Sequence, residues 1–141
     1  MSDAVRLTAT QEDYLETIYH LMQEGKVARN KDIASRLNVK RATVTGAVKQ
    51  LVAKGLVSHE THGHIVLTDA GIAIATTVIK GHRLFTTFFQ DILGLDAKES
   101  EDIACQLEHI VVGDALLRFE VLVGSIKSCT CAAKFTFSEE E

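Results

Sequence analysis

Apolar residues recur every three or four positions along most of this chain, which is the spacing of amphipathic α-helices. The recurrence predicts helices over residues 9–24, 31–37, 40–54, 70–93, 97–111 and 114–126. Gly25 and Gly55 follow the first and third of these segments, as glycine commonly does at a helix C-terminus. Because the chain also contains no proline, we expect a mainly α-helical fold.

Local signals refine the predicted ends of these helices. Thr8, with the acids from Asp13 to Glu16 just inside it, predicts the start of the first helix, because negative charge stabilises a helix N-terminus. Asn30 and Asp69 are expected to cap the second and fourth helices. Gly81 is the expected weak point of the long fourth helix.

The hydrophobic period changes after Gly55, where the runs LVSH and IVLT flank a turn around Gly63. Two short runs about a glycine-containing turn predict a β-hairpin. Asn38 and Val39 join the two short helices that precede it, as in a helix-turn-helix. A hairpin directly after this motif makes a winged helix-turn-helix at the N-terminus.

Basic residues are concentrated in one part of the sequence. Residues 25–55 hold eight Lys and Arg against the single acid Asp32, a net charge of +7, whereas the whole chain carries -4. The remaining residues therefore carry 7 basic and 18 acidic groups, or -11. A compact cationic segment on an acidic protein is typical of phosphate binding.

The second helix of a helix-turn-helix enters the DNA major groove with its N-terminal end. Cations there suit phosphate or guanine, and threonines can hydrogen-bond or offer a methyl group to thymine. Our candidate DNA-binding residues are Arg29, Lys31, Lys40, Arg41, Thr43, Thr45 and Lys49. His62 and His64 at the wing tip could also approach a phosphate, or could be turn residues without a function.

Cys105, Glu108 and His109 fall at positions i, i+3 and i+4 of a predicted helix and so share one face. Thiol, carboxylate and imidazole are ligands of divalent transition metals. Asp13 and Glu16 have a similar spacing on the first helix. Each signal also has a simpler explanation: a buried cysteine beside surface polar groups, or acids that complement a helix dipole.

Four segments together resemble the metal-dependent repressors typified by the diphtheria toxin repressor and the manganese transport regulator. They are QEDYLETIYHLMQEG, DIASRLNVKRATVTGAVKQLVAKGLV, TDAGIAIATTVIKGHRLFTTFFQDILGLD and EDIACQLEHIV. The resemblance covers roughly residues 8–126. It implies a homodimeric transcriptional repressor, not an enzyme, that binds a double-stranded DNA operator when Mn²⁺ or Fe²⁺ acts as corepressor. It also implies a winged helix-turn-helix followed by an all-helical dimerisation domain.

The resemblance assigns a metal-ligand set residue by residue. The set is Asp13, Glu16, His82, Cys105, Glu108 and His109. Asp13 and Glu16 match the manganese-type members, whereas Cys105 stands where the manganese type has Glu and the iron type has Cys. Thr86 stands where iron-type members have an ancillary Glu, so that second site is not expected in the iron-type form. Most donors are oxygen or nitrogen, and we favour manganese over iron.

The expected organisation is a DNA-binding domain over residues 1–69, a metal-binding and dimerisation domain over 70–126, and a tail over 127–141. The dimer contact is expected within 97–126, along an apolar stripe of Ile103, Leu107, Ile110, Leu116, Leu117 and Val121. We expect no SH3-like domain after residue 126, as in the short manganese-type members, because few residues follow it. Cys129 and Cys131 in the tail lie outside the family pattern. Two alternatives remain open for them: additional soft metal ligands, or inert thiols.

The apolar runs are too short for a membrane span, and the first residues lack an apolar signal core. We therefore expect a cytoplasmic protein. Two other functions remain open from the residues alone: a winged-helix repressor that senses an organic ligand, and a hydrolytic metalloenzyme. The metalloenzyme lacks a recognisable general base and leaves the cationic segment without a role.

Overall fold

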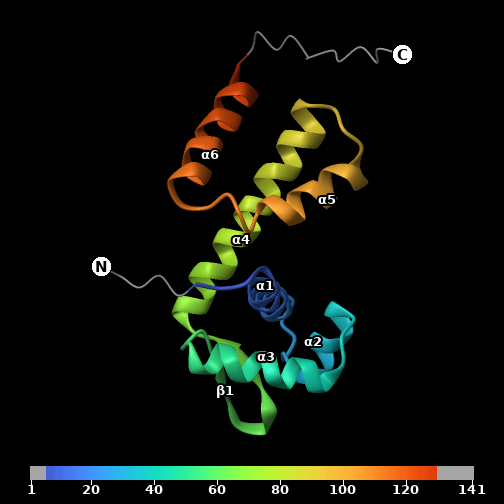
Figure 1. Cartoon of the computed structure of the whole chain (residues 1–141), viewed down its shortest axis with the longest axis vertical. Helices are drawn as coiled ribbons and strands as arrows, with labels where there is room; N and C mark the ends of the chain where they lie inside the picture. The colour runs from blue at the N-terminus through green and yellow to red at the C-terminus, as the bar shows by residue number, and fades with distance from the viewer. Residues whose placement is uncertain (1–5, 130–141) are drawn as a thin grey trace. The chain divides into compact units, whose positions relative to one another are not determined.

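The computed structural model describes residues 6–129. These residues contain α-helices α1 to α6, a π-helical turn and one two-stranded sheet (Figure 1). The chain divides into two compact units, residues 1–76 and 77–141. Helix α4 (Asp69–Thr87) contributes residues to both. The expectation of a mainly α-helical chain that begins with a winged helix-turn-helix is confirmed.

The first unit is built on three helices, α1 (Ala9–Gln23), α2 (Asn30–Leu37) and α3 (Arg41–Ala53). Each helix turns an apolar face inward, and Leu15, Ile18, Ile33, Val48 and Leu51 have no exposed surface. Asn38, at the end of α2, adopts a left-handed conformation with φ of 52°. Asparagine tolerates this conformation better than most residues, which allows the sharp turn into α3.

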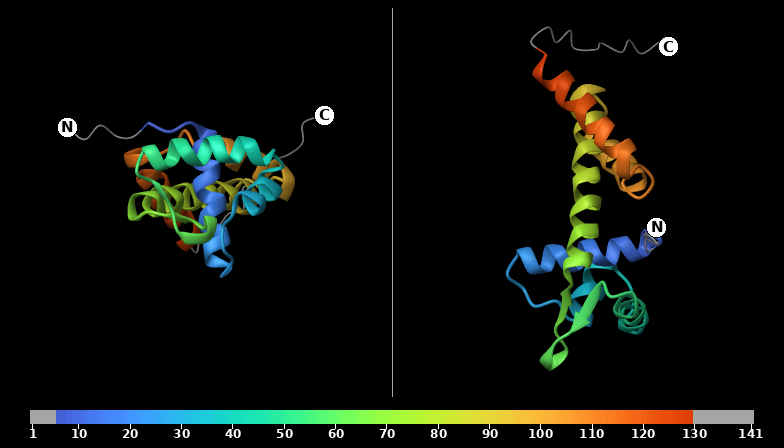
Figure 2. Two further views of the ribbon diagram at one scale, coloured as in Figure 1. Left: turned by 90° about the horizontal axis from the view of Figure 1, so that it is seen from below. Right: turned by 90° about the vertical axis from the view of Figure 1, so that its left-hand side faces the viewer.

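The wing consists of β1 (Val57–His59) and β2 (Ile65–Leu67), joined through the short 3₁₀ turn η1 (Thr61–Gly63). The strands are antiparallel, with Val57 opposite Leu67 and His59 opposite Ile65. Ala28 adds an isolated antiparallel bridge to Ile65. The right-hand view of Figure 2 shows this hairpin beside α3, which is seen end-on.

The predicted helix caps were partly wrong. Thr8, the predicted start signal, does cap α1 by accepting from the Gln11 amide, but the acid of the first turn is Glu12 and not one of the predicted acids from Asp13 to Glu16. Arg29 is the N-cap of α2, while the Asn30 side chain is engaged elsewhere. Thr68 replaces Asp69 at the start of α4: its Oγ1 accepts from the Gly71 amide at 3.2 Å and donates to the Gly55 carbonyl at 2.7 Å.

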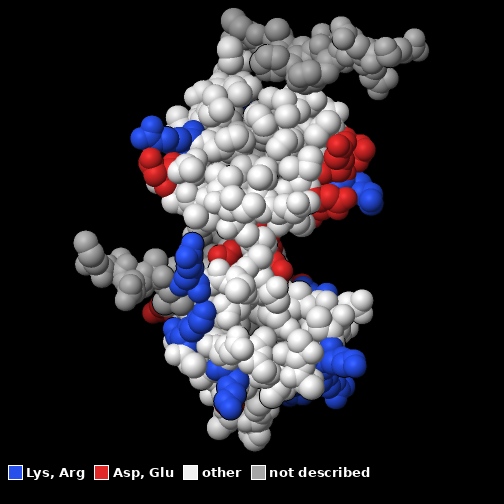
Figure 3. All heavy atoms as spheres, in the orientation of Figure 1, with Lys and Arg blue, Asp and Glu red and all other residues white. Residues whose placement is uncertain are grey.

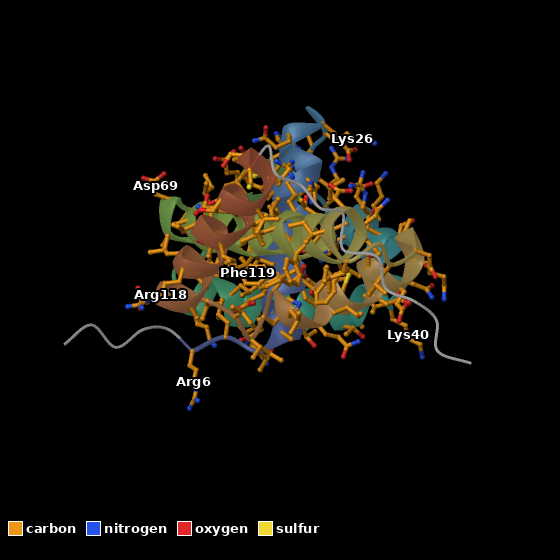
Figure 4. The ribbon with its side chains drawn as sticks, turned by 90° about the horizontal axis from the view of Figure 1, so that it is seen from above. Arg6, Lys26, Lys40, Asp69, Arg118 and Phe119 are labelled. Atoms are coloured by element: carbon orange, nitrogen blue, oxygen red, sulfur yellow. The ribbon has the colours of Figure 1, made fainter. Side chains whose placement is uncertain are left out.

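The second unit combines the later turns of α4 with η2 (Phe88–Ile92, a π-helical turn), α5 (Ala97–Leu107) and α6 (Gly113–Ser128). Phe85, Ala104 and Leu116 form its buried core. The Phe119 ring packs 5.0 Å from Phe85 between centroids. Figure 4 shows Phe119 directed into the interior while Arg118 points outward. None of the helices within residues 6–129 is long and apolar enough to cross a membrane.

Gly81 does not interrupt α4, although the sequence predicts a weak point there. α4 continues as regular helix through Thr87, and the wider π-helical turn begins only at Phe88. A Cβ atom on Gly81 would lie 3.6 Å from both Cα and Cβ of Glu108. These are ordinary contact distances, so the segment after α5 packs beside Gly81 with room for a methyl group.

Candidate functional site

Three potential metal ligands from separate parts of the second unit meet at one point. His82 lies on α4, Cys105 on α5, and Glu108 is the C-cap residue of α5. One ligand atom from each lies within 4.8 Å of the others. The Cys105 Sγ is 3.9 Å from Nδ1 of His82. This arrangement brings an imidazole, a thiol and a carboxylate together.

Glu108 is the centre of this cluster and is only 3% exposed. Its Oε2 lies 2.5 Å from Nδ1 of His82, and its Oε1 lies 3.3 Å from Nε2 of His109. Burying a carboxylate is unfavourable unless charged or hydrogen-bonding partners compensate it. The two imidazoles provide that compensation in the metal-free protein, and a divalent cation between the same groups would provide it as well.

The neighbouring Glu108 carboxylate raises the pKa of His82 to about 9, with a smaller contribution from Glu101. His82 is therefore protonated at neutral pH in the metal-free protein, and its Nδ1 donates to Glu108. Glu101 Oε1 lies 3.0 Å from the other ring nitrogen, Nε2. A metal ion that binds His82 has to displace a proton, as is usual for histidine ligands.

The predicted triplet is arranged differently from the expectation. α5 ends at Leu107, so Cys105 lies in the helix, Glu108 caps it, and His109 lies in the turn that follows. The three residues therefore do not share the face of one continuous helix. Cys105 and Glu108 meet His82, while His109 contacts Glu108.

Glu101 was missed in the sequence analysis. It precedes Cys105 by four residues on α5 and so lies on the same side of the helix. Its carboxylate is 55% exposed and contacts His82 from the solvent side. The spacing of residues 101, 105 and 108 was the signal that could have identified it.

Asp13 and Glu16 belong to the first unit, on α1. Both are partly buried. Glu16 Oε1 lies 3.4 Å from Nε2 of His20, one turn later on the same helix. Their position in the middle of α1, beyond its first turn, weakens the explanation that they serve the helix dipole.

The donor set of the second unit fits a transition metal by its chemistry. A buried, negatively charged Glu108 is surrounded by one thiol and two imidazoles, which are ligands of Mn²⁺, Fe²⁺ and Zn²⁺. Thr86 offers no carboxylate for a second site, and its hydroxyl oxygen is buried without a hydrogen-bond partner. Cys129 is exposed at the end of α6, and Cys131 lies outside the described residues.

The candidate DNA-binding residues are all exposed on α2, on α3 or immediately before them. They are Arg29, Lys31, Lys40, Arg41, Thr43, Thr45 and Lys49. Figure 3 shows Lys and Arg side chains over the part of the first unit that α2 and α3 form. A cationic surface therefore lies at the N-terminal end of α3.

The Thr45 hydroxyl and the cations paired with Glu24 already have partners within the protein, which reduces the groups that this surface has available for DNA. Thr45 Oγ1 donates to the Arg41 carbonyl and accepts from the Asn30 side chain, both at 3.0 Å, so its hydroxyl is occupied within the protein. Glu24 binds Arg36 and Lys26, at 2.5 Å and 2.7 Å. The hydrogen bond from Arg36 and then that from Lys26 lower the pKa of Glu24 to about 2. These two cations are therefore already paired.

Known proteins resemble the chain over most of its length. A family described as iron dependent repressor, N-terminal DNA binding domain, matches residues 6–65. Its companion, the metal binding and dimerisation domain, matches residues 68–134.

Individual relatives agree with the family match. An uncharacterised helix-turn-helix regulator of Methanocaldococcus jannaschii is 34% identical, over 82% of this chain and 94% of its own length. The diphtheria toxin repressor of Corynebacterium diphtheriae is 37% identical over 74% of this chain, which spans about half of that protein (46%). The solved structure of the manganese regulator SloR matches with a TM-score of 0.74 and 31% identity, over 87% of this chain and 57% of that one.

Proposed function

This chain belongs to the iron-dependent repressor family of transcriptional regulators, and we propose on that premise that it represses genes of metal-ion homeostasis when Mn²⁺ or Fe²⁺ binds. The observation that carries the metal dependence is the buried Glu108 carboxylate. It contacts His82 and His109, and one of its oxygens lies within 4.8 Å of the Cys105 Sγ. The family consists of transcriptional repressors, so the chain is not an enzyme.

The proposed ligands are Asp13, Glu16, His82, Cys105, Glu108 and His109. His82, Cys105 and Glu108 are supported by their mutual distances, and His109 by its contact with Glu108. Asp13 and Glu16 are supported by their place on α1 and by the resemblance to manganese-type members. A bound divalent cation would supply positive charge that offsets the negative charge of the carboxylates and of a Cys105 thiolate.

Manganese is the favoured metal. Five of the six proposed ligands offer oxygen or nitrogen, which suits the hard Mn²⁺ ion. The thiol of Cys105 shifts preference toward Fe²⁺, Co²⁺ or Zn²⁺. The similarity to a manganese regulator supports manganese, whereas the family name refers to iron.

The connection from metal to DNA runs through α1. This helix packs against both α2 and α3, so a constraint on Asp13 and Glu16 reaches the recognition helix through the core of the first unit. In a dimer, two recognition helices must enter major grooves roughly 34 Å apart. Fixing that spacing raises DNA affinity, and by linkage DNA must tighten metal binding by the same factor.

We assign DNA contact to the seven exposed residues of α2 and α3. Lys40, Arg41 and Lys49 bind phosphates or guanine, and Thr43 retains a hydroxyl for a base edge. Thr45 presents its methyl group, because its hydroxyl is occupied within the protein. Arg29 and Lys31 bind phosphates beside the recognition helix.

The proposed domains are 1–69 for DNA binding, 70–126 for metal binding and dimerisation, and 127–141 as a tail. Part of the expected dimer stripe is exposed: Ile110 by 73%, Val121 by 69% and Leu117 by 56%. Leu116 is only 4% exposed and packs in the core of its own unit, so it does not belong to the dimer surface. We therefore place the dimer contact on the exposed residues of α6 and the turn before it.

A binding titration tests the proposed function. A duplex is first selected from a random-sequence library with the full chain and Mn²⁺, and fluorescence anisotropy then follows its binding with EDTA, with Mn²⁺ or with Fe²⁺ under anaerobic conditions. The proposal expects tight binding only with metal. Metal-independent binding, which a repressor of the organic-ligand type would show, contradicts it.

A further inference from the structure

Gly46 on α3 is a glycine that the fold of the first unit does not require. It is exposed and lies within regular helix, without a positive φ. A Cβ atom added to it would meet no part of the described chain within 4 Å, its own stretch of helix apart. Glycine inside a helix is less stable than alanine. The position therefore carries a destabilising residue that no packing contact explains.

Gly46 also faces directly away from the core of the first unit. Val44 and Val48, two residues before and two residues after it, have no exposed surface. Two residues make about half a turn of an α-helix, so the residue halfway between two buried ones points to the opposite side. Such a position on a solvated helix usually carries a polar or charged side chain. Here it carries none.

The side chains around Gly46 toward the N-terminal end of α3 are small. Ala42 and Thr43 lie one turn before it, and both are exposed. Thr45 precedes it and presents a methyl group, because its hydroxyl is occupied within the protein. Lys49 lies one turn after it, with its charge on a long and flexible side chain. The surface at Gly46 thus consists mainly of methyl groups and helix backbone.

A helix that enters the DNA major groove is limited by the side chains that point at the bases. The groove is about 12 Å wide, and an α-helix with its side chains measures about 10–12 Å across. Thymine projects a C5-methyl group into this groove, where apolar groups contact it. A recognition helix that has no side chain at its outermost position can bring its backbone against that methyl group.

We propose that Gly46 is a specificity-determining residue of α3, and that its missing side chain leaves room for a thymine methyl group against the helix backbone. The inference rests on the proposed function, because it takes the N-terminal end of α3 as the part that enters the major groove. It adds a contact at a residue that offers neither a charge nor a side-chain hydrogen bond.

Gly46→Ala should change stability and DNA binding in opposite directions. Alanine has the better helix propensity and meets no packed neighbour, so the denaturant midpoint of the variant should rise. Its methyl group takes the space of the thymine methyl group, so affinity for the selected duplex should fall about tenfold, the effect of one mismatched base pair. A lower midpoint, or an affinity equal to that of the parent, overturns the inference.

Removing the methyl group from the DNA identifies the contact. Thymines of the selected duplex are replaced one position at a time by uracil, which lacks only the C5-methyl group. At one position the replacement should weaken the parent about fourfold, the contribution of one buried methyl group. The same replacement should reduce the loss in Gly46→Ala from about tenfold to about twofold. If that loss is the same on every uracil duplex, the two methyl groups do not meet and the proposal fails.

Ala53→Gln is the matched control. Ala53 is exposed on the same side of α3, two turns further from its N-terminal end. Its substitution adds bulk without charge and should leave the affinity for the selected duplex unchanged. An equal loss in Ala53→Gln would show that binding responds to any bulk on this side of α3, and would overturn the inference.

All titrations use full-length protein at one saturating Mn²⁺ concentration and one salt concentration. Circular dichroism and sedimentation confirm that each variant is folded and has the oligomeric state of the parent. Failure of the proposed function would appear separately, as binding of the selected duplex by the parent without metal. The comparison of parent with variant stays valid in that case, because both are measured under the same conditions.

Discussion

Oε2 of Glu108 lies 2.5 Å from Nδ1 of His82, although 26 residues separate them in the sequence. The contact joins α4 to the residue that caps α5. A buried carboxylate in contact with two histidines needs positive charge. Protonated histidine supplies it without metal, and we propose that a divalent cation supplies it when bound.

Metal binding should stabilise the folded protein through Glu108. At a free Mn²⁺ concentration of about one hundred times Kd, the parent should gain about 2.7 kcal/mol, because the ion binds the folded state and not the unfolded one. Glu108→Gln keeps the size of the side chain and loses its charge, so it should gain almost nothing. Thermal unfolding with and without Mn²⁺ measures both. Glu99→Gln on the exposed side of α5 is the control, and an unchanged response of Glu108→Gln would exclude this residue as a ligand.

Cys105 should determine the order in which metals activate the protein. Cys105→Glu replaces a soft donor by a hard one and should weaken activation by Zn²⁺ and Co²⁺ relative to Mn²⁺, by about tenfold or more. DNA-binding titrations with Mn²⁺, Fe²⁺, Co²⁺ and Zn²⁺ give the order for the parent and the variant. If the two orders are the same, another residue sets the selectivity.

Two glycines of α4 should respond to alanine in opposite directions. A Cβ on Gly71 would lie 2.1 Å from the Leu56 carbonyl oxygen, so Gly71→Ala should destabilise the first unit by about 1–3 kcal/mol. The nearest atoms to a Cβ on Gly81 are 3.6 Å away, an ordinary contact. Gly81→Ala should therefore gain about 0.5–1 kcal/mol from helix propensity. Denaturant unfolding measures both; equal effects would show that packing does not distinguish the sites.

The exposed apolar residues of α6 should hold the dimer together. Val121→Asp places a charge on this surface, where desolvation in a dimer is unfavourable, and Val121 is exposed enough for the subunit to remain folded. Sedimentation equilibrium should show a shift toward monomer. Lys98→Asp, at an exposed position of α5, should leave the dimer unchanged. A dimer that survives Val121→Asp intact would place the interface elsewhere.

The helices and the wing were predictable because their apolar periods and glycine stops are local signals. The errors arose where tertiary contacts determine the role of a residue. Asn30 bonds Thr45 on the next helix and not its own helix start. Gly81 packs against Glu108, a residue far away in the sequence, and α4 continues past it as regular helix.

The site was predictable in its residues but not in its form. Helical spacing identified Cys105 and Glu108, the resemblance added His82, and the structure brings the three together. The sequence pattern extended α5 through His109, whereas the helix ends at Leu107. Only the folded chain shows that Glu108 faces two histidines, because helix periodicity has no information about a turn.

The central claim is that Glu108 and His109 make DNA binding depend on metal. The most direct measurement is the affinity for the selected duplex, with and without saturating Mn²⁺ or Fe²⁺, of the parent and of the Glu108→Ala/His109→Ala variant. The account predicts a folded dimeric variant, by circular dichroism and sedimentation, whose DNA affinity does not change on adding metal. A variant that responds to metal as strongly as the parent would contradict the account.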